Sequence, residues 1–277
     1  MKKKILITGS SGFIGSNLLS SLNKKYQVLT VSRFNGQNNS YTGDLEDFNF
    51  VNRICKNVKV IVHLAYSKNY MSNITITKNL IQAARENKVQ QIILVSSMSA
   101  KRNYPDDYGK NKKEIELLIK DSKLNYTILR PSIVYGKGSK SFEFIINYIK
   151  KIPFFTPIIG NGKYKIYPVK VDDVVYAINK CIDNKRTLNK EYDLPGKDGI
   201  YFIDLINCLK KGINVSKKNI NIPIWFCKII SIFFPKILNK NNIKNLTEDS
   251  LADITNAAKD FKYSPISFNK GIENGLI

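Results

Sequence analysis

Short apolar runs alternate along the first half of the chain with segments whose apolar residues recur at helical spacing. Short apolar runs bounded by turn residues are typical of buried strands. The predicted strands are Ile5–Thr8, Gln27–Ser32, Val58–His63, Gln91–Ser96 and Tyr126–Leu129, and the predicted helices between them are Gly12–Asn23, Phe48–Cys55, Asn73–Asn87 and Tyr108–Asp121. This alternation predicts an α/β fold with a parallel sheet covered by helices on both faces. Because such crossovers are right-handed, a doubly wound sheet is the favoured topology.

The pattern loosens after Pro131, where turns rich in glycine and proline separate shorter elements. The elements expected there are helices at Phe142–Lys151, Asp172–Asp183 and Phe202–Lys211 and strands at Tyr167–Val171 and Tyr192–Leu194. We therefore predict a core of residues 1–135 and a smaller, mainly substrate-binding lobe within residues 136–277. The segment around 172–196 is expected to return to the core, so that the two parts interleave.

Three glycines spaced three apart, Gly9, Gly12 and Gly15, mark the point where the first strand becomes the first helix. A glycine in the turn adopts dihedral angles that other residues avoid. A second glycine lets the main chain approach a pyrophosphate, and a third lets the helix pack tightly on its strand. The helix N-terminus then offers N–H groups and a partial positive charge to an anion. The pattern indicates nucleotide binding, and a tight turn without a ligand is the plainer alternative.

The end of the second predicted strand bears on which dinucleotide binds. Residues 31–33, VSR, include no acidic side chain that would accept a hydrogen bond from the ribose hydroxyls of NAD. Arg33 can instead pair with a 2′-phosphate, which favours NADP, and a solvated arginine is the alternative. Asp44, within GDL at 43–45, either accepts a hydrogen bond from adenine or caps a turn.

Tyr108 and Lys112 lie four residues apart in a predicted helix and therefore share a face. A lysine ammonium beside a phenol stabilises the phenolate, so we expect the pKa of Tyr108 to lie below its usual value of about 10. Such a tyrosine can give or take a proton near neutral pH, as carbonyl–alcohol chemistry requires. Ser96 and Ser97 follow a buried strand and are expected at the same edge of the sheet, as ligand-binding hydroxyls or as turn residues.

The composition is that of a folded protein with a strong basic excess. Of 277 residues 43% are hydrophobic, and no uninterrupted apolar stretch reaches the length of a transmembrane helix. The N-terminal residues do not resemble a signal peptide, and the four cysteines lack the spacing of a zinc site or a disulfide framework. We expect no metal and a reducing, cytoplasmic location. The net charge of +22 reflects either the coding bias of an AT-rich sequence or a role in attracting anions. The lysines of the chain are scattered and no nucleic-acid-binding motif is present, so we expect no nucleic-acid partner.

Residues 222–238, IPIWFCKIISIFFPKIL, form the most apolar region of the chain. A core or interface helix of the second lobe, interrupted by Pro223 and Pro235, is one interpretation. The other is a segment that rests weakly on a membrane surface, with flanking lysines against anionic lipid.

These features together resemble the short-chain dehydrogenase/reductase superfamily, in its extended branch of nucleotide-sugar epimerases and dehydratases. The matching motifs run along nearly the whole chain in the family's order. They are TGSSGFIG (8–15), GDLED (43–47), HLA (63–65), YGKNKKEIE (108–116), LRPSIVYG (129–136), YPVKVDDVVYAI (167–178) and DITNAAKDFKYSPISFNKGI (253–272). The resemblance implies a Rossmann-type core that binds NAD or NADP, with NADP favoured by Arg33, a sugar-nucleotide substrate and a homodimer.

The resemblance also implies a role for each matching residue. Tyr108 would be the acid/base, Lys112 would bind the nicotinamide ribose and tune the phenol, and Ser97 would hydrogen-bond the substrate oxygen, with Ser99 as the alternative. His63 would be a structural residue beside the cofactor. The residues implied in cofactor binding are Gly9, Ser11, Gly12, Phe13, Ile14, Gly15, Arg33, Asp44, Leu45, Leu64, Ala65, Tyr108, Lys112 and Pro131.

Two departures from the family pattern affect the substrate pocket. Ser97 and Tyr108 are separated by 108 − 97 = 11 positions, where the family commonly has a longer loop. Tyr66 follows the HLA motif at a position where a small residue is usual. The expected function is a nucleotide-sugar epimerase, dehydratase or 4-keto-sugar reductase that acts by hydride transfer. The alternative is a non-catalytic NADP-binding scaffold, an accessory subunit of a larger complex.

Overall fold

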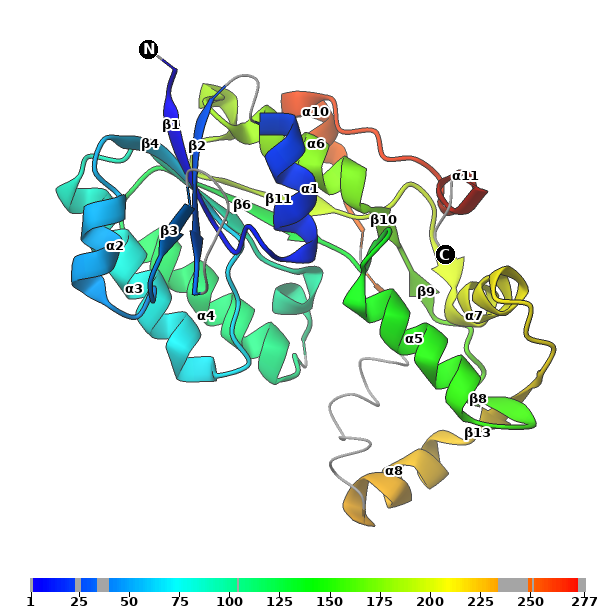
Figure 1. Cartoon of the computed structure of the whole chain (residues 1–277). Coiled ribbons are helices and arrows are strands. Elements are labelled where there is room, and N and C mark those ends of the chain that lie inside the picture. The colour runs from blue at the N-terminus through cyan, green and yellow to red at the C-terminus, as the bar shows by residue number, and fades with distance from the viewer. Residues whose placement is uncertain are drawn as a thin grey trace.

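The computed structural model describes residues 2–22, 26–33, 40–103, 105–233, 249–250 and 252–273. Its centre is a seven-stranded parallel sheet with the strand order β11-β6-β5-β4-β1-β2-β3 (Figure 1). The strands are β1 (Lys4–Thr8), β2 (Gln27–Ser32), β3 (Ser40–Thr42), β4 (Val58–His63), β5 (Gln91–Val95), β6 (Tyr126–Pro131) and β11 (Lys190–Leu194). The α/β, doubly wound fold predicted from the sequence is confirmed.

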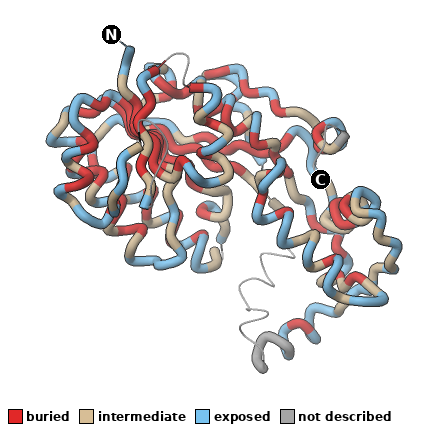
Figure 2. The backbone as a smooth tube through the Cα atoms, viewed as in Figure 1, coloured by how far each residue is buried: buried red, intermediate tan, exposed pale blue. Residues whose placement is uncertain are grey.

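Helices cover both faces of the sheet (Figure 1). One layer holds α1 (Phe13–Leu22), α6 (Val171–Cys181) and α10 (Thr255–Phe261), and the other holds α2 (Phe48–Ile54), α3 (Tyr70–Glu86) and α4 (Asp107–Asp121). Alternate residues of β1 face the two layers: Ile5 and Ile7 pack with Leu18 of α1, whereas Leu6 packs with Leu80 of α3. Figure 2 shows the buried residues concentrated along the sheet strands. This double burial explains why the strands read as continuous apolar runs.

The strand order reverses at β1, whose neighbours are β2 on one side and β4 on the other. The chain leaves β1 into α1 in one layer, and it leaves β4 into α3 in the opposite layer. The connections therefore part at the carboxyl ends of β1 and β4, which is where open α/β sheets bind ligands.

A second lobe is built mainly from the chain after β6. Its helices are α5 (Lys140–Lys151), α7 (Phe202–Gly212), α8 (Ile224–Phe233) and α11 (Phe268–Glu273). Its short strands pair as β7 (Val134–Tyr135) with β10 (Val169–Lys170), β8 (Phe155–Ile159) with β13 (Lys218–Ile222), and β9 (Lys165–Ile166) with β12 (Ile200–Tyr201). The lobe has its own apolar core, which includes Tyr135, Phe142, Leu205 and Phe268. Between these elements, α6, the turn η2 (Lys185–Thr187) and β11 rejoin the sheet-bearing body.

Several element boundaries differ from the sequence prediction. Helix α3 begins at Tyr70 because the Asn69 side chain accepts a hydrogen bond from the Met71 N–H at 2.9 Å. Helix α4 begins at Asp107 because the Asp106 carboxylate accepts a hydrogen bond from the Gly109 N–H at 2.8 Å. Such caps satisfy N–H groups that the helix leaves free. Apolar spacing alone does not detect these polar first turns.

The predicted strand Tyr167–Val171 is wrong in extent. Only Val169 and Lys170 pair with a neighbouring strand, and Val171 already opens helix α6. Asp172 and Asp173 occupy the first turn of that helix, where carboxylates interact favourably with the N-terminal end of the dipole. The edge strand β3 was not predicted, because its sequence, Ser-Tyr-Thr, has no apolar run and none of its residues is buried.

Candidate active site

The glycine turn between β1 and α1 is tightly packed. Gly9 has a φ of +71°, and a Cβ atom there would lie 2.6 Å from the backbone nitrogen of Ala65. A Cβ on Gly15 would lie 2.3 Å from the carbonyl oxygen of Gly9. The Gly12 N–H closes the turn by donating to the Gly9 carbonyl at 3.0 Å. Gly9 and Gly15 therefore cannot carry a side chain, whereas Ser11 and Gly12 are exposed at the start of α1.

The end of β4 forms a wall beside this turn. The Leu64 N–H donates to the Thr8 carbonyl at 3.1 Å, and the Ala65 N–H donates to the Thr8 hydroxyl at 3.3 Å. The His63 ring lies 2.8 Å from the same hydroxyl, measured from Nδ1. Burial, with a smaller effect of the Lys112 charge, lowers the pKa of His63 to about 3. His63 is therefore a neutral, buried hydrogen-bonding group at pH 7.

The remaining residues implied in cofactor binding lie around the same edge of the sheet. Phe13 and Ile14, both half-buried, begin α1, and Pro131 is buried at the end of β6. Arg33 directly follows β2 and is exposed, and residues 34–39 after it lie outside the described residues. Asp44 accepts a hydrogen bond from the Glu46 N–H at 2.9 Å, so its carboxylate caps a turn. Leu45 is buried against the α2 and α3 layer.

Helix α4 and the turn after β5 bring the predicted acid/base group together with a serine. Ser97 caps the short helix η1 (Met98–Lys101), and its side chain lies close enough to the Tyr108 phenol to lower the pKa of that group. A Cβ on Gly109 would lie 2.6 Å from the Ser99 carbonyl oxygen, so this glycine allows α4 to approach η1 closely. The Ser96 hydroxyl is buried without a hydrogen-bond partner among the described residues, and the Ser99 N–H donates to the Ser97 hydroxyl at 3.2 Å. The serine that contacts Tyr108 is thus Ser97.

The expected lowering of the Tyr108 pKa is wrong for this structure. The pKa of the Tyr108 phenol lies above its usual value, mainly because burial disfavours the phenolate. The nearby Ser97 hydroxyl lowers the pKa, and the Asp106 carboxylate raises it further. The residue as a whole nevertheless keeps 40% of its surface exposed. The Lys112 ammonium lies 5.9 Å from the centre of the Tyr108 ring and donates to the Val95 carbonyl at 3.1 Å. Burial also lowers the pKa of Lys112 to about 8.

The aromatic ring of Tyr66 also interacts with the Lys112 ammonium. The Lys112 ammonium lies 4.7 Å from the centre of the Tyr66 ring, closer than to the Tyr108 ring. The Tyr66 ring also meets the Tyr108 ring edge to face, with 5.0 Å between their centres. Burial and the neighbouring Tyr108 raise the pKa of Tyr66 to about 12, so its phenol is neutral. The sequence marked Tyr66 as unusually bulky, but nothing in the pattern indicated its contact with Lys112.

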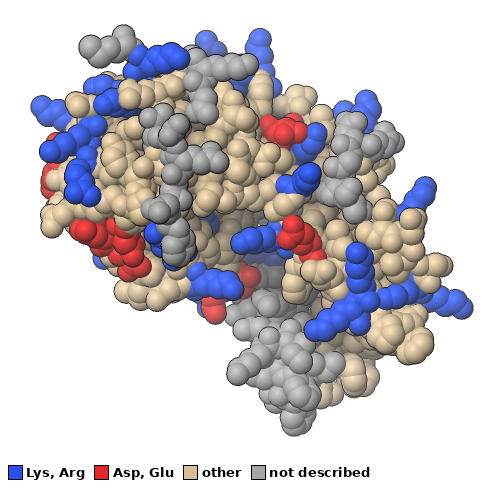
Figure 3. All heavy atoms as spheres, in the orientation of Figure 1, with Lys and Arg blue, Asp and Glu red and all other residues tan. Residues whose placement is uncertain are grey.

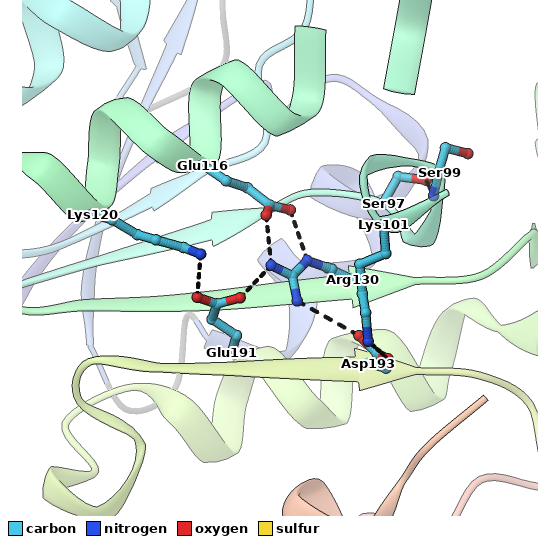
Figure 4. A network of polar contacts seen from close by, with 8 residues as sticks. All are labelled: Ser97, Ser99, Lys101, Glu116, Lys120, Arg130, Glu191 and Asp193. Atoms are coloured by element: carbon cyan, nitrogen blue, oxygen red, sulfur yellow. Dashed lines mark hydrogen bonds and ion pairs between the residues drawn. The ribbon is translucent and has the colours of Figure 1, made fainter. Parts of the chain in front are cut away.

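A buried network of charges holds the elements of the site together (Figure 4). Arg130 on β6 donates two hydrogen bonds to the Glu116 carboxylate, at 2.9 Å and 2.6 Å, and also contacts Glu191 and Asp193 on β11. Lys101 of η1 completes the network through an ion pair of 2.6 Å with Asp193. Arg130, Glu116 and Asp193 are all at least nine-tenths buried. The network therefore links α4, which carries Tyr108, to the turn that carries Ser97.

The described residues contain neither a metal-binding cluster nor a membrane-spanning helix. Within the described residues, no three His, Cys, Asp or Glu side chains lie close enough to share a metal ion. The four cysteines, all in described parts of the chain, are unpaired. Among the helices that the structure describes, none has the length and apolar character needed to cross a membrane.

A family model described as the NAD dependent epimerase/dehydratase family matches residues 5–194, more than half of the chain. The chain belongs to this family. Its glycine turn fits the family's cofactor, because a backbone without side chains at Gly9 and Gly15 leads directly into the N-terminus of α1. Leu64 and Ala65 would then lie beside the bound dinucleotide, next to Gly9.

The chain is also similar to individual proteins whose descriptions differ. It is 28% identical to a UDP-glucose 4-epimerase of Vibrio cholerae, over 96% of this chain and 92% of the relative. It is 24% identical to the mitochondrial NADH dehydrogenase 1 alpha subcomplex subunit 9 of Dictyostelium discoideum, over 68% of this chain and 54% of that protein. The fold matches the crystal structure of UDP-glucuronic acid 4-epimerase from Bacillus cereus in complex with UDP-glucuronic acid and NAD, with a TM-score of 0.76, 21% identity, and coverage of 98% and 96% of the two chains.

Proposed function

We propose that the protein is an NAD(P)-dependent enzyme that epimerises a nucleotide sugar or reduces a 4-keto nucleotide sugar, with Tyr108 as the acid/base. The observation that carries the proposal is the placement of Ser97, at the start of η1, close enough to the Tyr108 phenol to lower its pKa, with Lys112 one helical turn further along α4. These groups follow β5, one strand away from the wall formed at the end of β4 beside the glycine turn.

Each protein group has a definable task in this chemistry. The bound dinucleotide would supply a hydride acceptor or donor. The glycine turn would hold its phosphates, and Lys112 would reach the ribose by leaving the Val95 carbonyl. Ser97 can orient the oxygen of the reacting carbon, and Tyr108 can exchange a proton with that oxygen. Because the pKa of Tyr108 is raised, the free protein holds a neutral phenol, which is the form that donates a proton when a ketone is reduced.

The proposed substrate class rests on the family and on the shape of the molecule. The relatives include a UDP-glucose 4-epimerase, and a fold neighbour was solved with UDP-glucuronic acid. The surface is hollowed between the sheet-bearing body and the second lobe (Figure 3). Lys163 and Lys165, exposed on the second lobe, are candidates to meet a diphosphate, whereas Lys170 already pairs with Asp172 at 2.7 Å.

A second candidate function is a cofactor-binding scaffold without turnover. The similarity to the NADH dehydrogenase subunit favours it, as does the Lys112 ammonium, which is held by the Val95 carbonyl and the Tyr66 ring. The placement of the Ser97 hydroxyl near the Tyr108 phenol favours the enzyme, because a scaffold does not require a paired phenol and hydroxyl.

The variant Tyr108→Phe tests the proposed mechanism. We expect its turnover of a 4-keto nucleotide sugar with NADH or NADPH to fall by about 100-fold or more, since a positioned acid contributes about that factor. Cofactor affinity, measured by fluorescence of the bound reduced dinucleotide, should change by less than about threefold. Tyr176→Phe is the matched control. The Tyr176 phenol donates to the carbonyl of Phe261 at the end of α10, in the helix layer opposite the one that contains α4.

Two results would decide against the proposal. Wild-type turnover in Tyr108→Phe would remove the assigned acid/base. A wild-type protein that retains a tightly bound dinucleotide but turns over no member of a panel of UDP- and dTDP-sugars would favour the scaffold.

A further inference from the structure

Helix α8 presents apolar side chains to solvent. Trp225 is 63% exposed, and Phe226 and Ile229 are each 43% exposed. Ile229 lies four positions after Trp225 and three after Phe226, so it neighbours both side chains on the helix surface. Among residues 224–229 of α8, only Cys227 is buried. The interpretation of this segment as a core helix is therefore wrong for residues 224–229; the rest of the apolar region, residues 230–238, has no described side chains.

The neighbouring strand pair β8 and β13 adds to this surface. Ile220 on β13 is 45% exposed, and Phe154, directly before β8, is 88% exposed. We call Phe154, Ile220, Trp225, Phe226 and Ile229 the apolar tip. Phe154 lies before the first residue of the parallel strand pair and α8 follows the last, so the apolar tip runs along the length of the pair. Ile220 and the exposed residues of α8 fall within ten positions of each other, and clustered exposed apolar side chains mark an interaction surface.

The two chain segments that contain the apolar tip carry charge of one sign only. Residues 144–171 and 205–233 contain five lysines each and no arginine, aspartate or glutamate. Basic side chains gather over the second lobe on the face seen in Figure 3. The whole chain, by contrast, has 22 acidic residues. Acidic side chains are therefore missing from both segments, although the rest of the chain carries them.

Three of these lysines lie beside Phe154 of the apolar tip. The Lys217 ammonium donates to the Ile149 and Ile152 carbonyls, at 2.9 Å and 2.7 Å, and so ties the end of α5 to β13. Its neighbour Lys218, which is exposed, stands opposite Phe155 in the strand pair. Lys151, also exposed, is at the end of α5. Lys151 and Lys218 thus flank Phe154 from two elements.

We propose that the apolar tip and its flanking lysines dock the protein onto an anionic membrane surface. Large apolar and aromatic side chains next to lysines match the boundary between lipid headgroups and acyl chains, where tryptophan is favoured. Helix α8, at ten residues, is too short to span a bilayer and suits a position in the interface. A second copy of this chain is a poorer occupant, because two surfaces without acidic residues would repel each other. The proposal does not depend on the catalytic activity.

The single tryptophan of the chain, Trp225, gives a direct test. The full-length protein is titrated with vesicles of phosphatidylcholine alone and with vesicles that contain half phosphatidylglycerol. We expect a blue shift of Trp225 emission and co-sedimentation with the anionic vesicles only. Brominated lipid should quench the emission, and 0.5 M salt should weaken the binding because it screens the lysines.

Two pairs of variants separate the apolar and basic contributions. Lys151→Gln with Lys218→Gln should reduce partitioning about tenfold or more, since each lysine near an anionic surface is worth about fivefold. Lys56→Gln with Lys59→Gln removes the same charge from exposed positions on the sheet-bearing body and should have little effect. Phe226→Ser with Ile229→Ser should also reduce partitioning, whereas Met71→Ser with Leu117→Ser, at exposed positions on α3 and α4, should not.

Three results would overturn the proposal. They are unchanged Trp225 emission at millimolar anionic lipid and low salt, equal losses in the test and control variants, and an emission shift that follows protein concentration without lipid. The last would assign the apolar tip to a contact between copies, which size-exclusion chromatography would detect.

Discussion

Replacing Lys112 by methionine should stabilise the folded protein at neutral pH while it removes the ammonium from the candidate site. Lys112 is 5% exposed, and burial lowers its pKa from 10.5 to about 8, with Glu116 offsetting part of the effect. The unfolded chain therefore binds this proton more tightly than the folded chain. At about 1.4 kcal/mol per pKa unit, the charged group costs about 3 kcal/mol of folding free energy below pH 8.

The variant also loses favourable contacts, so its net gain is smaller. Methionine retains much of the volume of the lysine side chain. It cannot donate to the Val95 carbonyl or interact as a cation with the Tyr66 ring, and each of these contacts is worth about 1 kcal/mol. We therefore expect Lys112→Met to be about 1 kcal/mol more stable than the wild type at pH 7.

The sign of this difference should change with pH. As the pH rises from 8 towards 10.5, the folded protein no longer has to hold a buried charge, and the wild type gains stability relative to the variant. Urea unfolding at pH 7 and pH 9.5 measures the stability difference between variant and wild type at both pH values. Lys113→Met, at an exposed neighbouring position, is the control. If Lys112→Met is less stable than the wild type at pH 7, or if the difference is the same at both pH values, the buried-charge argument is refuted.

Three other substitutions follow from the packing of the site. Gly15→Ala should lower the unfolding free energy by about 1–3 kcal/mol and weaken dinucleotide binding, because the new Cβ meets the Gly9 carbonyl; unchanged affinity by titration calorimetry would contradict this. Arg130→Met should cost about 3–5 kcal/mol in urea unfolding, because Glu116 is left buried without its partner; a neutral effect would argue against the network. Tyr66→Ala should shift the pH profile of turnover, whereas Tyr66→Phe should not, since only alanine removes the ring beside the ammonium; identical profiles would exclude a positioning role.

The sequence predicts the sheet well because its strands are buried on both faces. Ile5, Leu6 and Ile7 all lie in apolar surroundings, so the strand reads as an unbroken apolar run whichever layer each side chain faces. The glycine spacing is equally readable, because a positive φ at Gly9 and a close backbone contact at Gly15 leave few alternatives to glycine. Constraints of this kind act on single residues, so the residue type at each position reveals them.

The charge interactions of the candidate site, by contrast, depend on residues that are far apart in the sequence. The spacing of Tyr108 and Lys112 predicts a shared helix face, but the direction of the ammonium depends on Val95 and Tyr66, which come from other elements. The partners Lys101 and Asp193 are 92 positions apart, and no periodic pattern connects them. The short strand pairs of the second lobe are likewise set by contacts between distant segments. Pattern reading therefore finds which groups are present and misses how they are oriented.

The charge network around Arg130 has a consequence for biosynthesis. Arg130 leaves the ribosome 61 residues before Glu191, which contacts it from β11 together with Asp193, and helix α4 leaves earlier still. Until β11 is added to the edge of the sheet, the guanidinium has only Glu116 as a buried partner, and Lys101 has no carboxylate from that strand to hold η1. A nascent chain that ends near residue 185 would thus expose an incomplete sheet edge with a loosely held serine turn. This intermediate would be accessible to chaperones and proteases until the rest of the second lobe has been synthesised.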